Sequence, residues 1–360
     1  MPLIPSPPHM PEQPGLAQPG LAPAQPGLPR PLAAEDLNRA RVLADRLRTR
    51  FAQTLVGQET LRESLIVALA AGGHILIESV PGLAKTTAAQ TLATSVSGTF
   101  KRVQCTPDLM PSDLVGTQVF DFSKQRFSTQ IGPIHANFVL LDEINRSNAK
   151  TQSAMLEAMA EGATTIGGER IALPKPFMVI ATQNPIEEEG TFTLPEAQMD
   201  RFMMKAVMTY PTADEEERML DMLTRRGSDT IDPSTLNRDA LSIQDVEFLR
   251  SCARRVHVSD SIMRYAVDLA ATSRGAGTNP LRDLAALVRL GASPRASIAL
   301  VRIGQANALL AGRDYVIPED VKSFAHEVLR HRIVLTFEAM ADGVSADQVV
   351  DSVLEAVPVP

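Results

Sequence analysis

Apolar and polar positions follow two different patterns along the chain, and the change between them comes near residue 211. Before it, short apolar runs typical of buried strands alternate with segments of helical periodicity. The predicted strands are residues 74–78, 100–105, 138–143, 177–182 and 205–210, and the predicted helices between them lie near 85–97, 148–161 and 195–202. Because the strands are almost continuously apolar, they predict a parallel sheet covered by helices on both faces.

Helical patterns flank this α/β region on both sides. One apolar stripe recurs at four-residue steps from Glu35 onward: Leu43, Leu47, Phe51 and Leu55. After residue 211 no further strand is expected. The predicted helices there span about 213–227, 243–256, 260–273, 280–291, 295–311, 318–330 and 345–356, with Pro318 in the first turn of its helix. The pattern predicts an α/β core at residues 35–210 and an all-helical domain at 211–357.

Residues 1–34 have a different composition. They hold 11 of the 26 prolines of the chain, three copies of the sequence QPGL and almost no charged or aromatic residue. Such a segment has little apolar surface to offset the entropy lost on ordering, so we expect a disordered tail. A ligand for a proline-recognising partner is the alternative.

Charge and cysteine content narrow the environment and the partners. A formal charge of -7 and a pI near 5.5 give no broad attraction to nucleic acid or to anionic lipid. Cys105 and Cys252 lie far apart and outside any metal-ligand spacing, which suits a reducing compartment. The longest apolar stretch, residues 65–80, is interrupted by glycines, His74 and Glu78, and does not predict a membrane span. We expect a cytoplasmic protein that acts on proteins or small molecules.

The sequence ESVPGLAKTT, residues 78–87, follows an apolar strand and resembles a phosphate-binding loop in which Ser79 and Ala84 replace the two glycines. Such a loop binds an anion through successive backbone N–H groups and the positive end of the next helix. The predicted nucleotide contacts are Ser79, Val80, Pro81, Gly82, Leu83, Ala84, Lys85, Thr86 and Thr87. Lys85 is expected to reach the outer phosphates and the Thr86 hydroxyl to ligate Mg²⁺. Ala84 needs only an ordinary backbone conformation if it opens the helix.

Polar residues end two other predicted strands. Asp142 and Glu143 end the strand at 138–143, where one acid suits the Mg²⁺ shell and the other can polarise an attacking water. Asn184 follows the strand at 177–182 and is placed to orient that water or to contact the terminal phosphate. A solvated strand end for the acids, and a turn cap before Pro185 for the amide, are the alternatives.

The order of these motifs, followed by a helical domain, resembles the AAA+ ATPases. Longer stretches narrow the resemblance to the MoxR family, over roughly residues 36–356. They are VGQE (56–59), GLAKT (82–86), CTPDLMPSDLVG (105–116), GPIHANFVLLDEINR (132–146), ATQNPIEEEGTFTLPEAQMDRF (181–202) and GASPRA (291–296). The fold this implies is a P-loop core with a parallel sheet, followed by a helical lid.

The resemblance also implies roles for single residues. Val56 and Gly57 match the adenine site, Lys85 and Thr86 the Walker A motif, Asp142 and Glu143 the Walker B pair, and Asn184 the sensor 1 position. Arg201 resembles an arginine finger that reaches a neighbouring subunit's nucleotide, and Arg295 the sensor 2 arginine, in its own subunit or the next. A guanidinium suits both tasks because it stays charged and offers a fork of donors to phosphate oxygens. Without the family, a surface charge at a helix end would explain Arg201, and local capping or ion pairing would explain Arg295.

The family resemblance further implies hairpins near residues 116–129 and 165–176, which alternate apolar and polar residues as hairpins do. It implies an Mg²⁺-dependent ATPase that assembles into a ring, with a hexamer expected, and remodels or matures client proteins. Its partners would include a protein with a von Willebrand factor A domain, and its role would include metal-cofactor insertion. Two alternatives are a motor stimulated by nucleic acid and a scaffold that binds ATP without hydrolysing it.

Overall fold

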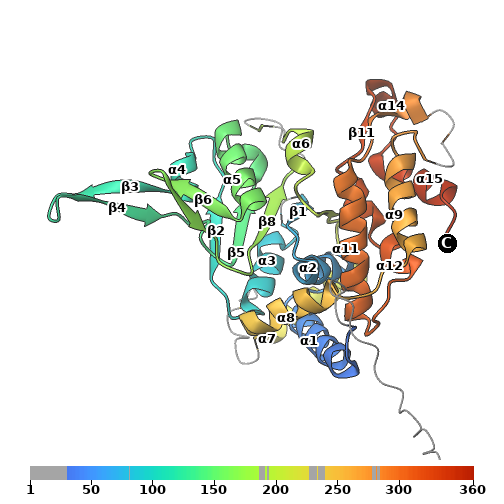
Figure 1. The fold of residues 1–360 in the computed structure, drawn as a ribbon, viewed down its shortest axis with the longest axis horizontal. Coiled ribbons are helices and arrows are strands. Elements are labelled where there is room, and N and C mark those ends of the chain that lie inside the picture. Colours follow the sequence, from blue (N-terminus) through green and yellow to red (C-terminus); the bar gives the residue numbers. More distant parts are fainter. Residues whose placement is uncertain are drawn as a thin grey trace, which may run out of the picture. The chain divides into compact units, whose positions relative to one another are not determined.

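Five parallel strands form the central sheet of the computed structural model (Figure 1). They are β1 (Ile75–Glu78), β2 (Phe100–Gln104), β5 (Phe138–Asp142), β8 (Met178–Gln183) and β9 (Met204–Val207), in the spatial order β2-β5-β8-β1-β9. Each coincides with a predicted strand to within a few residues, so the predicted parallel sheet is confirmed. Since β1 lies between β8 and β9, the loop that follows β1 emerges beside the ends of both neighbours, which is where open α/β sheets bind ligands.

The structure describes residues 31–80, 82–185, 191–192, 194–226, 233, 240–277, 281 and 284–360. Residues 31–360 form one compact unit. The predicted tail lies almost wholly outside the described residues, as does Pro81 of the predicted loop. The predicted boundary between a core and a lid at residue 211 stays a prediction.

Helices cover both faces of the sheet, and the alternation of side chains along β1 shows how. Ile75 and Ile77 pack into a large apolar cluster with α2 (Glu59–Ala71) and α3 (Lys85–Thr94), whereas Leu76 joins a second cluster with α5 (Ala149–Glu161). Strand β5 is buried along its whole length. These strands therefore read as continuous apolar runs because both of their faces are buried.

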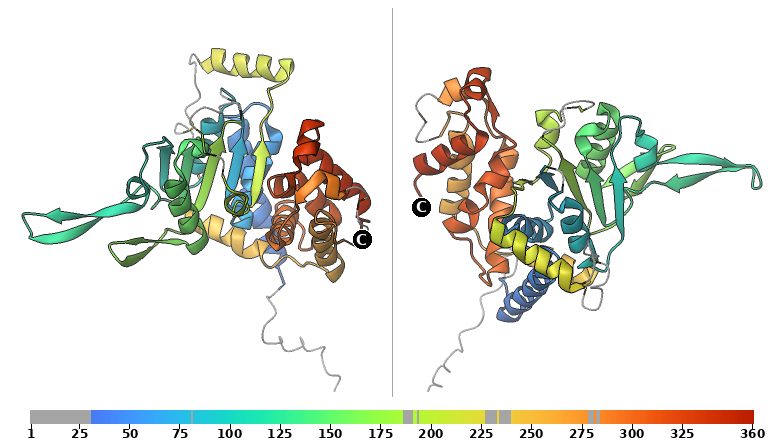
Figure 2. Two further views of the ribbon diagram at one scale, coloured as in Figure 1. Left: turned by 90° about the horizontal axis from the view of Figure 1, so that it is seen from above. Right: turned by 180° about the vertical axis from the view of Figure 1, so that it is seen from behind.

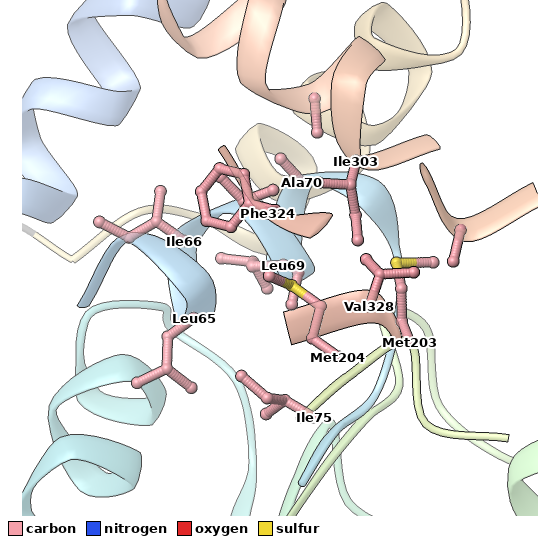
Figure 3. Close-up of a cluster of buried hydrophobic side chains, with 14 of the residues drawn as sticks. Leu65, Ile66, Leu69, Ala70, Ile75, Met203, Met204, Ile303, Phe324 and Val328 are labelled. Atoms are coloured by element: carbon pink, nitrogen blue, oxygen red, sulfur yellow. The ribbon is translucent and has the colours of Figure 1, made fainter. Parts of the chain in front are cut away.

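The helices that precede and follow the sheet share the larger cluster. The stripe on α1 (Ala34–Ala52) is buried as predicted, with Leu47 and Phe51 fully inaccessible. Figure 3 shows side chains of α2, β1 and β9 packed against Ile303 and Val328 from the helical region. A contiguous core thus joins the sheet to the helices that follow it.

The region after residue 211 is helical, as predicted, but its segmentation differs. Its helices are α7 (Ala213–Arg226), α8 (Ile243–Ala253), α9 (Asp260–Thr272), α10 (Leu284–Leu287), α11 (Pro294–Leu310), α12 (Pro318–Lys322), α13 (Ala325–Leu329), α14 (Phe337–Ala341) and α15 (Ala346–Ala356). The single helix expected at 318–330 is two short helices. The helix expected at 280–291 is wrong beyond Leu287, because β10 (Val288–Leu290) pairs antiparallel with β11 (Val334–Leu335). The expectation that no strand follows residue 211 fails at this short ladder.

Two hairpins project from the sheet region, close to where they were expected (Figure 2). Strands β3 (Gly116–Asp121) and β4 (Arg126–Ile131) form the first, and β6 (Ala163–Ile166) and β7 (Glu169–Ala172) the second. The first carries exposed aromatic side chains near its tip: the Phe120 ring makes edge contacts with Phe122 and Phe127, at centroid distances of 5.1 and 5.2 Å. Helix α4 (Pro111–Val115) leads into it.

Some helices differ from the sequence-based prediction. Helices α2, α4 and α14 were not predicted, and α6 (Glu196–Met199) is shorter than the helix expected at 195–202.

Cys105 and Cys252 are both buried, and burial raises the pKa of the Cys105 thiol to about 12. Within the described parts of the chain, no helix is both long enough and apolar enough to cross a membrane.

Candidate functional site

The loop after β1 has the geometry of an anion-binding turn. Gly82 adopts φ +86°, which supplies the predicted permissive position, and α3 begins at Lys85. The Lys85 ammonium reaches back over the loop and donates to the Ser79 carbonyl oxygen at 3.2 Å. Ser79 is almost fully buried, and its N–H continues the ladder to the Gln183 carbonyl oxygen. A small side chain therefore fits this strand end.

Ala84 departs from its expected conformation. It adopts φ 60° and ψ 26°, in the left-handed region, and it stands just outside the helix as the cap of α3. The expectation of an ordinary backbone there is wrong, because the chain must turn at Ala84 before the N–H of Ala88 can bond to the Ala84 carbonyl oxygen. A left-handed non-glycine residue costs about 1–2 kcal/mol, and such strain gathers at ligand-binding turns.

Asp142 ends β5 next to this loop. Its Oδ1 accepts a hydrogen bond from the Thr182 hydroxyl at 2.7 Å, and its Oδ2 lies 3.4 Å from the Thr86 hydroxyl oxygen. The Arg102 guanidinium donates to the same Oδ2 through Nη2 at 2.6 Å and through Nε at 3.2 Å. The Asp142 side chain is only 8% exposed, so its oxygens are oriented by neighbours and not by solvent. The structure thus brings Thr86 and Asp142 together as predicted.

Glu143 directly follows β5 and adopts φ 57°, in the left-handed region. Its N–H donates to the Thr182 hydroxyl oxygen at 2.9 Å, and its Oε2 accepts from Gln104 Nε2 at 2.9 Å and Arg146 Nη1 at 3.2 Å. Asn184 follows β8 on the same edge, is 3% exposed and accepts a bond from Asn145 Nδ2 at its main-chain oxygen. The three predicted strand-end residues therefore share the carboxyl edge of the sheet with the loop.

A cavity of about 400 Å³ adjoins the loop. Its walls come from the segment before α2, from the loop and from α7: Thr54, Leu55, Val56, Gln58, Gly82, Leu83, Ala84, Thr87, Tyr210, Pro211, Glu215, Glu216, Met219, Met222 and Leu223. Val56 lines it as predicted. Gly57 is next to Val56 and adopts φ +69°. A Cβ at Gly57 would come within 2.9 Å of the carboxylate of Glu215, which lines the cavity. An apolar pocket beside a phosphate loop is suited to a flat base.

A second cavity, of about 410 Å³, contains both predicted arginines. Its lining is Gly72, Gly73, His74, Met159, Ala160, Asp200, Arg201, Met203, Arg295, Ile298, Ala299, Arg302 and Arg332, and we call it the arginine cavity. Gly73 and His74 directly precede β1, and Met203 directly precedes β9. The cavity therefore lies at the amino edge of the sheet, whereas the phosphate loop lies at the carboxyl edge. The four residues of β1, at about 3.3 Å each, separate the two edges by roughly 13 Å.

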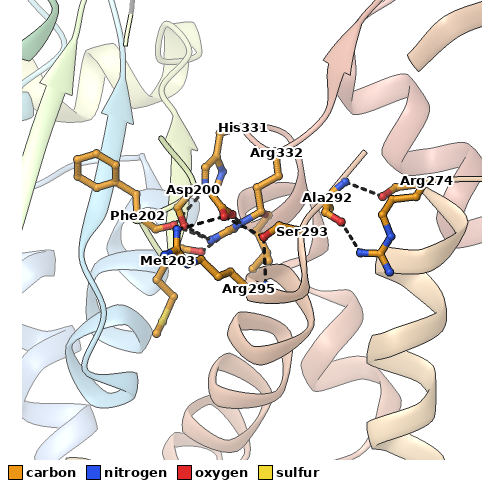
Figure 4. Close-up of polar contacts among 11 residues, drawn as sticks. Asp200, Phe202, Met203, Arg274, Ala292, Ser293, Arg295, His331 and Arg332 are labelled. Atoms are coloured by element: carbon orange, nitrogen blue, oxygen red, sulfur yellow. Dashed lines mark hydrogen bonds and ion pairs between the residues drawn. The ribbon is translucent and has the colours of Figure 1, made fainter. Parts of the chain in front are cut away.

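Asp200 organises one wall of the arginine cavity (Figure 4). Its carboxylate accepts from Arg332 Nε at 2.7 Å, from the Ser293 hydroxyl at 2.8 Å and from Arg295 Nη1 at 3.4 Å. Arg332 is buried and also donates to the Phe202 carbonyl oxygen, and burial lowers its pKa. Arg295 is the opposite case, with a side chain 55% exposed. Arg201 donates to the Leu156 carbonyl oxygen at 3.2 Å.

Comparisons with known proteins agree with this geometry. A family model described as "ATPase family associated with various cellular activities (AAA)" matches residues 74–204, and one described as "AAA lid domain" matches residues 283–353. Chaperone MoxR1 of Mycobacterium tuberculosis is 44% identical over 306 residues, which cover 85% of this chain and 79% of the relative. The chain belongs to the MoxR family of AAA+ ATPases.

Two further comparisons extend over most of the chain. The protein YeaC of Bacillus subtilis is 42% identical over 309 residues, with 86% of this chain and 92% of the relative covered. A crystal structure from Cytophaga hutchinsonii, described as that of a candidate ATPase, superimposes with a TM-score of 0.82 at 41% identity. It covers 91% of this chain and 97% of that one. The MoxR resemblance and the fold are therefore confirmed.

Several residues of this MoxR-family chain that contact Asp142 or Glu143, or line the arginine cavity, were not predicted. Arg102 and Gln104 lie on the strand beside Asp142, and Thr182 lies on the strand at its other side. Arg302 lines the arginine cavity seven positions after Arg295 on α11, which places the two on one helix face. Alternation could have suggested Arg102 and Gln104, since both fall on one face of a strand next to an acidic strand end.

Proposed function

We propose that this protein binds ATP with Mg²⁺ at the carboxyl edge of its sheet and hydrolyses it in a ring of identical chains. Each neighbour would contribute the arginines of its arginine cavity. The observation that carries the proposal is the placement of Lys85, Asp142 and Glu143 on one edge of the sheet and of Arg201 and Arg295 on the other. Side chains that flank the same strand at opposite ends cannot meet at one γ-phosphate.

The nucleotide would lie across the phosphate loop with its base in the adjoining cavity. Val56 supplies one apolar wall of that cavity, and Met219 and Leu223 of α7 supply another. The backbone N–H groups of residues 82–87 and the first turn of α3 then face the phosphates. The Lys85 ammonium donates a hydrogen bond to the Ser79 carbonyl oxygen. We expect it to donate to a phosphate oxygen instead when ATP binds, because the charged phosphate is the stronger hydrogen-bond acceptor.

The residues present fit a magnesium ion. Mg²⁺ is usually bound by one or two protein oxygens together with substrate phosphates and water. The Thr86 hydroxyl and the Asp142 Oδ2 converge within 3.4 Å beside the loop, and Asp142 is held in place by Thr182. When bound there, Mg²⁺ would neutralise charge that develops on the phosphate oxygens. Thr86 and Asp142 are the two protein groups that we assign to hold it.

Glu143 would activate the attacking water. Its carboxylate is 23% exposed, next to the loop, and it is oriented by Gln104 and Arg146. The water oxygen attacks the γ-phosphorus, its proton passes to Glu143, and the bond to the β-phosphate oxygen breaks to leave ADP and phosphate. Asn184, at the end of the next strand along the sheet, would hold the water or a γ-phosphate oxygen in line.

Arg201 and Arg295 would complete the site of the next subunit. The identical chains would then meet head to tail, and such interfaces close into rings; we propose a hexamer. The relative named Chaperone MoxR1 supports client remodelling as the use of the energy. The exposed Phe120, Phe122 and Phe127 of the first hairpin offer a surface for a client. By the family resemblance we propose a von Willebrand factor A domain protein as partner, and action in the cytoplasm.

Substitution of Glu143 tests the proposed hydrolysis. Glu143→Gln keeps the shape and one acceptor oxygen of the side chain but removes the base, so phosphate release is expected to fall about 10²–10⁴-fold while ATP binding stays. Glu161→Gln is the matched control, because Glu161 is an exposed acid at the end of α5. Purified protein that binds no ATP, or a Glu143→Gln variant with full turnover, would contradict the proposal.

A further inference from the structure

Arg102 occupies the oxygen of Asp142 that faces the phosphate loop. It extends from β2, donates two hydrogen bonds to Asp142 Oδ2, and makes the ion pair at 2.6 Å. The Thr86 hydroxyl oxygen lies 3.4 Å from that same atom. The second carboxylate oxygen is already taken by Thr182. The guanidinium therefore sits on the one oxygen that can contribute to a magnesium shell shared with Thr86.

The burial of the two partners is unequal. Asp142 is 8% exposed and is held by the hydroxyl of the neighbouring strand, so its carboxylate cannot turn away. A buried carboxylate without a countercharge is strongly disfavoured. Arg102 is 48% exposed, and its remaining contact is a 3.4 Å bond to the Gln104 side-chain oxygen. The arginine can therefore move into water at little cost, whereas the acid stays.

We propose that Arg102 is a positioning residue that takes the place of the metal on Asp142 in the nucleotide-free protein and is released when ATP binds with Mg²⁺. A guanidinium and a divalent cation repel each other at one carboxylate oxygen, so the two states exclude each other. Arg102 keeps Asp142 neutralised and in its rotamer between turnovers, and it sets the Mg²⁺ concentration at which the site loads. This inference rests on the proposed function.

The test compares Arg102→Gln with Lys101→Gln in the full-length protein. Both changes remove one positive charge from β2, but side chains alternate along a strand, so Lys101 points away from Asp142. Binding of a fluorescent, non-hydrolysable ATP analogue is titrated with MgCl₂. Loss of a charge-assisted bond that competes with the ion is expected to lower the half-saturating Mg²⁺ concentration by about 10- to 100-fold for Arg102→Gln. Lys101→Gln is expected to match the wild type.

A second readout needs no nucleotide. The melting temperature of Arg102→Gln is expected to be lower than that of the wild type without Mg²⁺ and to rise with MgCl₂ alone, because the ion then fills the vacated oxygen. Arg102→Lys, which keeps the charge but not the fork, is expected to lie between the two. A purely structural ion pair would lower the melting temperature with no recovery on adding MgCl₂ and no change in the Mg²⁺ titration, and that result would overturn the inference.

The outcomes separate this inference from the proposed function. Wild-type protein that fails to bind the analogue at any Mg²⁺ concentration contradicts the proposed function. Wild-type binding together with an unchanged or raised Mg²⁺ requirement in Arg102→Gln contradicts the role of Arg102 alone.

Discussion

The two edges of the central sheet are built differently. At the carboxyl edge, Asp142 and Asn184 are buried, and bonds from neighbouring strands hold the acids in place. At the amino edge, Arg295 is 55% exposed and has one long contact to Asp200. The acids of the first edge are thus oriented within the chain, whereas a further contact would have to order Arg295 at the second. Under the proposed function, the two edges are complementary halves of a site that forms between neighbouring chains.

The distribution of charged side chains also differs between the two edges of the sheet. The acids that would serve a metal and a water gather beside the phosphate loop, and the arginine cavity contains four arginines against the single acid Asp200. An excess of guanidinium groups in one cavity suits an anion with several oxygens. A triphosphate at the carboxyl edge of another copy of the chain, as proposed above, would have that character.

The largest expected effect comes from removing the arginine that would cross between copies. Arg201→Ala should lower ATP turnover by about 10³–10⁵-fold while it leaves ATP affinity nearly unchanged, as for arginine fingers that act on the transition state. Phosphate release and equilibrium binding measure the two quantities. Arg264→Ala, which removes an exposed i,i+4 ion pair on α9, is the control and should retain turnover. Normal turnover in Arg201→Ala would remove the distinction between the two edges.

Low pH is expected to lower the free energy of unfolding through His74, which lies at the amino edge of the sheet. Burial lowers the pKa of His74 to about 4, against an ordinary value of 6.5, and its Nδ1 accepts a bond from the Val179 N–H. The His74 imidazole therefore binds a proton less readily in the folded protein than in the unfolded chain. The stability contribution is complete above pH 6.5 and declines as the pH falls toward 4, by roughly 3 kcal/mol at about 1.4 kcal/mol per pKa unit.

Urea unfolding at several pH values measures this dependence. His74→Asn keeps an acceptor but cannot be protonated in this range, so its free energy of unfolding should fall less steeply between pH 6.5 and 4. His257→Asn, at an exposed position, should keep the wild-type slope. Equal slopes in all three proteins would show that His74 is not the sensitive group.

Nucleotide affinity should depend on the carboxyl edge. Lys85→Ala removes a charged contact to the phosphates and should cost about 1.5–3 kcal/mol, or roughly 10- to 100-fold in ATP affinity. Isothermal titration with ATP and MgCl₂ measures it. Lys150→Ala is the matched control, since Lys150 is also in the first turn of a helix, α5, and is exposed. If both variants bind alike, the loop is not the phosphate site.

The smallest effect concerns the backbone of the loop. Gly82 and Gly168 both adopt φ +86°, and a Cβ on either would meet nothing within 4 Å. Gly82→Ala and Gly168→Ala should therefore each lower the free energy of unfolding by about 1 kcal/mol through the backbone alone. Only Gly82→Ala should also weaken ATP binding, because Gly168 lies in the second hairpin. Unchanged ATP affinity in Gly82→Ala would show that the turn tolerates other conformations.

Sequence reasoning found the carboxyl edge more fully than the amino edge, for a physical reason. Continuous apolar strands reveal their own ends, so Asp142, Glu143 and Asn184 could be placed at one edge without a structure. Arg201 and Arg295 lie on segments that come together through tertiary packing, such as that of α11 on α2, and Asp200, the partner of Arg295, gave no local signal. The strand at 288–290 was missed because its apolar residues suit a helix equally well. The left-handed Ala84 was missed because nothing but its backbone angles reveals it.

A mixing experiment tests the central claim that the two edges act between copies. Glu143→Gln and Arg201→Ala proteins, each expected to have strongly reduced turnover alone, are combined before ring assembly, and phosphate release is measured against the unmixed samples. If sites form between neighbours, about a quarter of the interfaces in a random equal mixture pair an intact Glu143 with an intact Arg201. The mixture is then expected to recover roughly that share of wild-type turnover. A mixture as inactive as its two components would contradict the account.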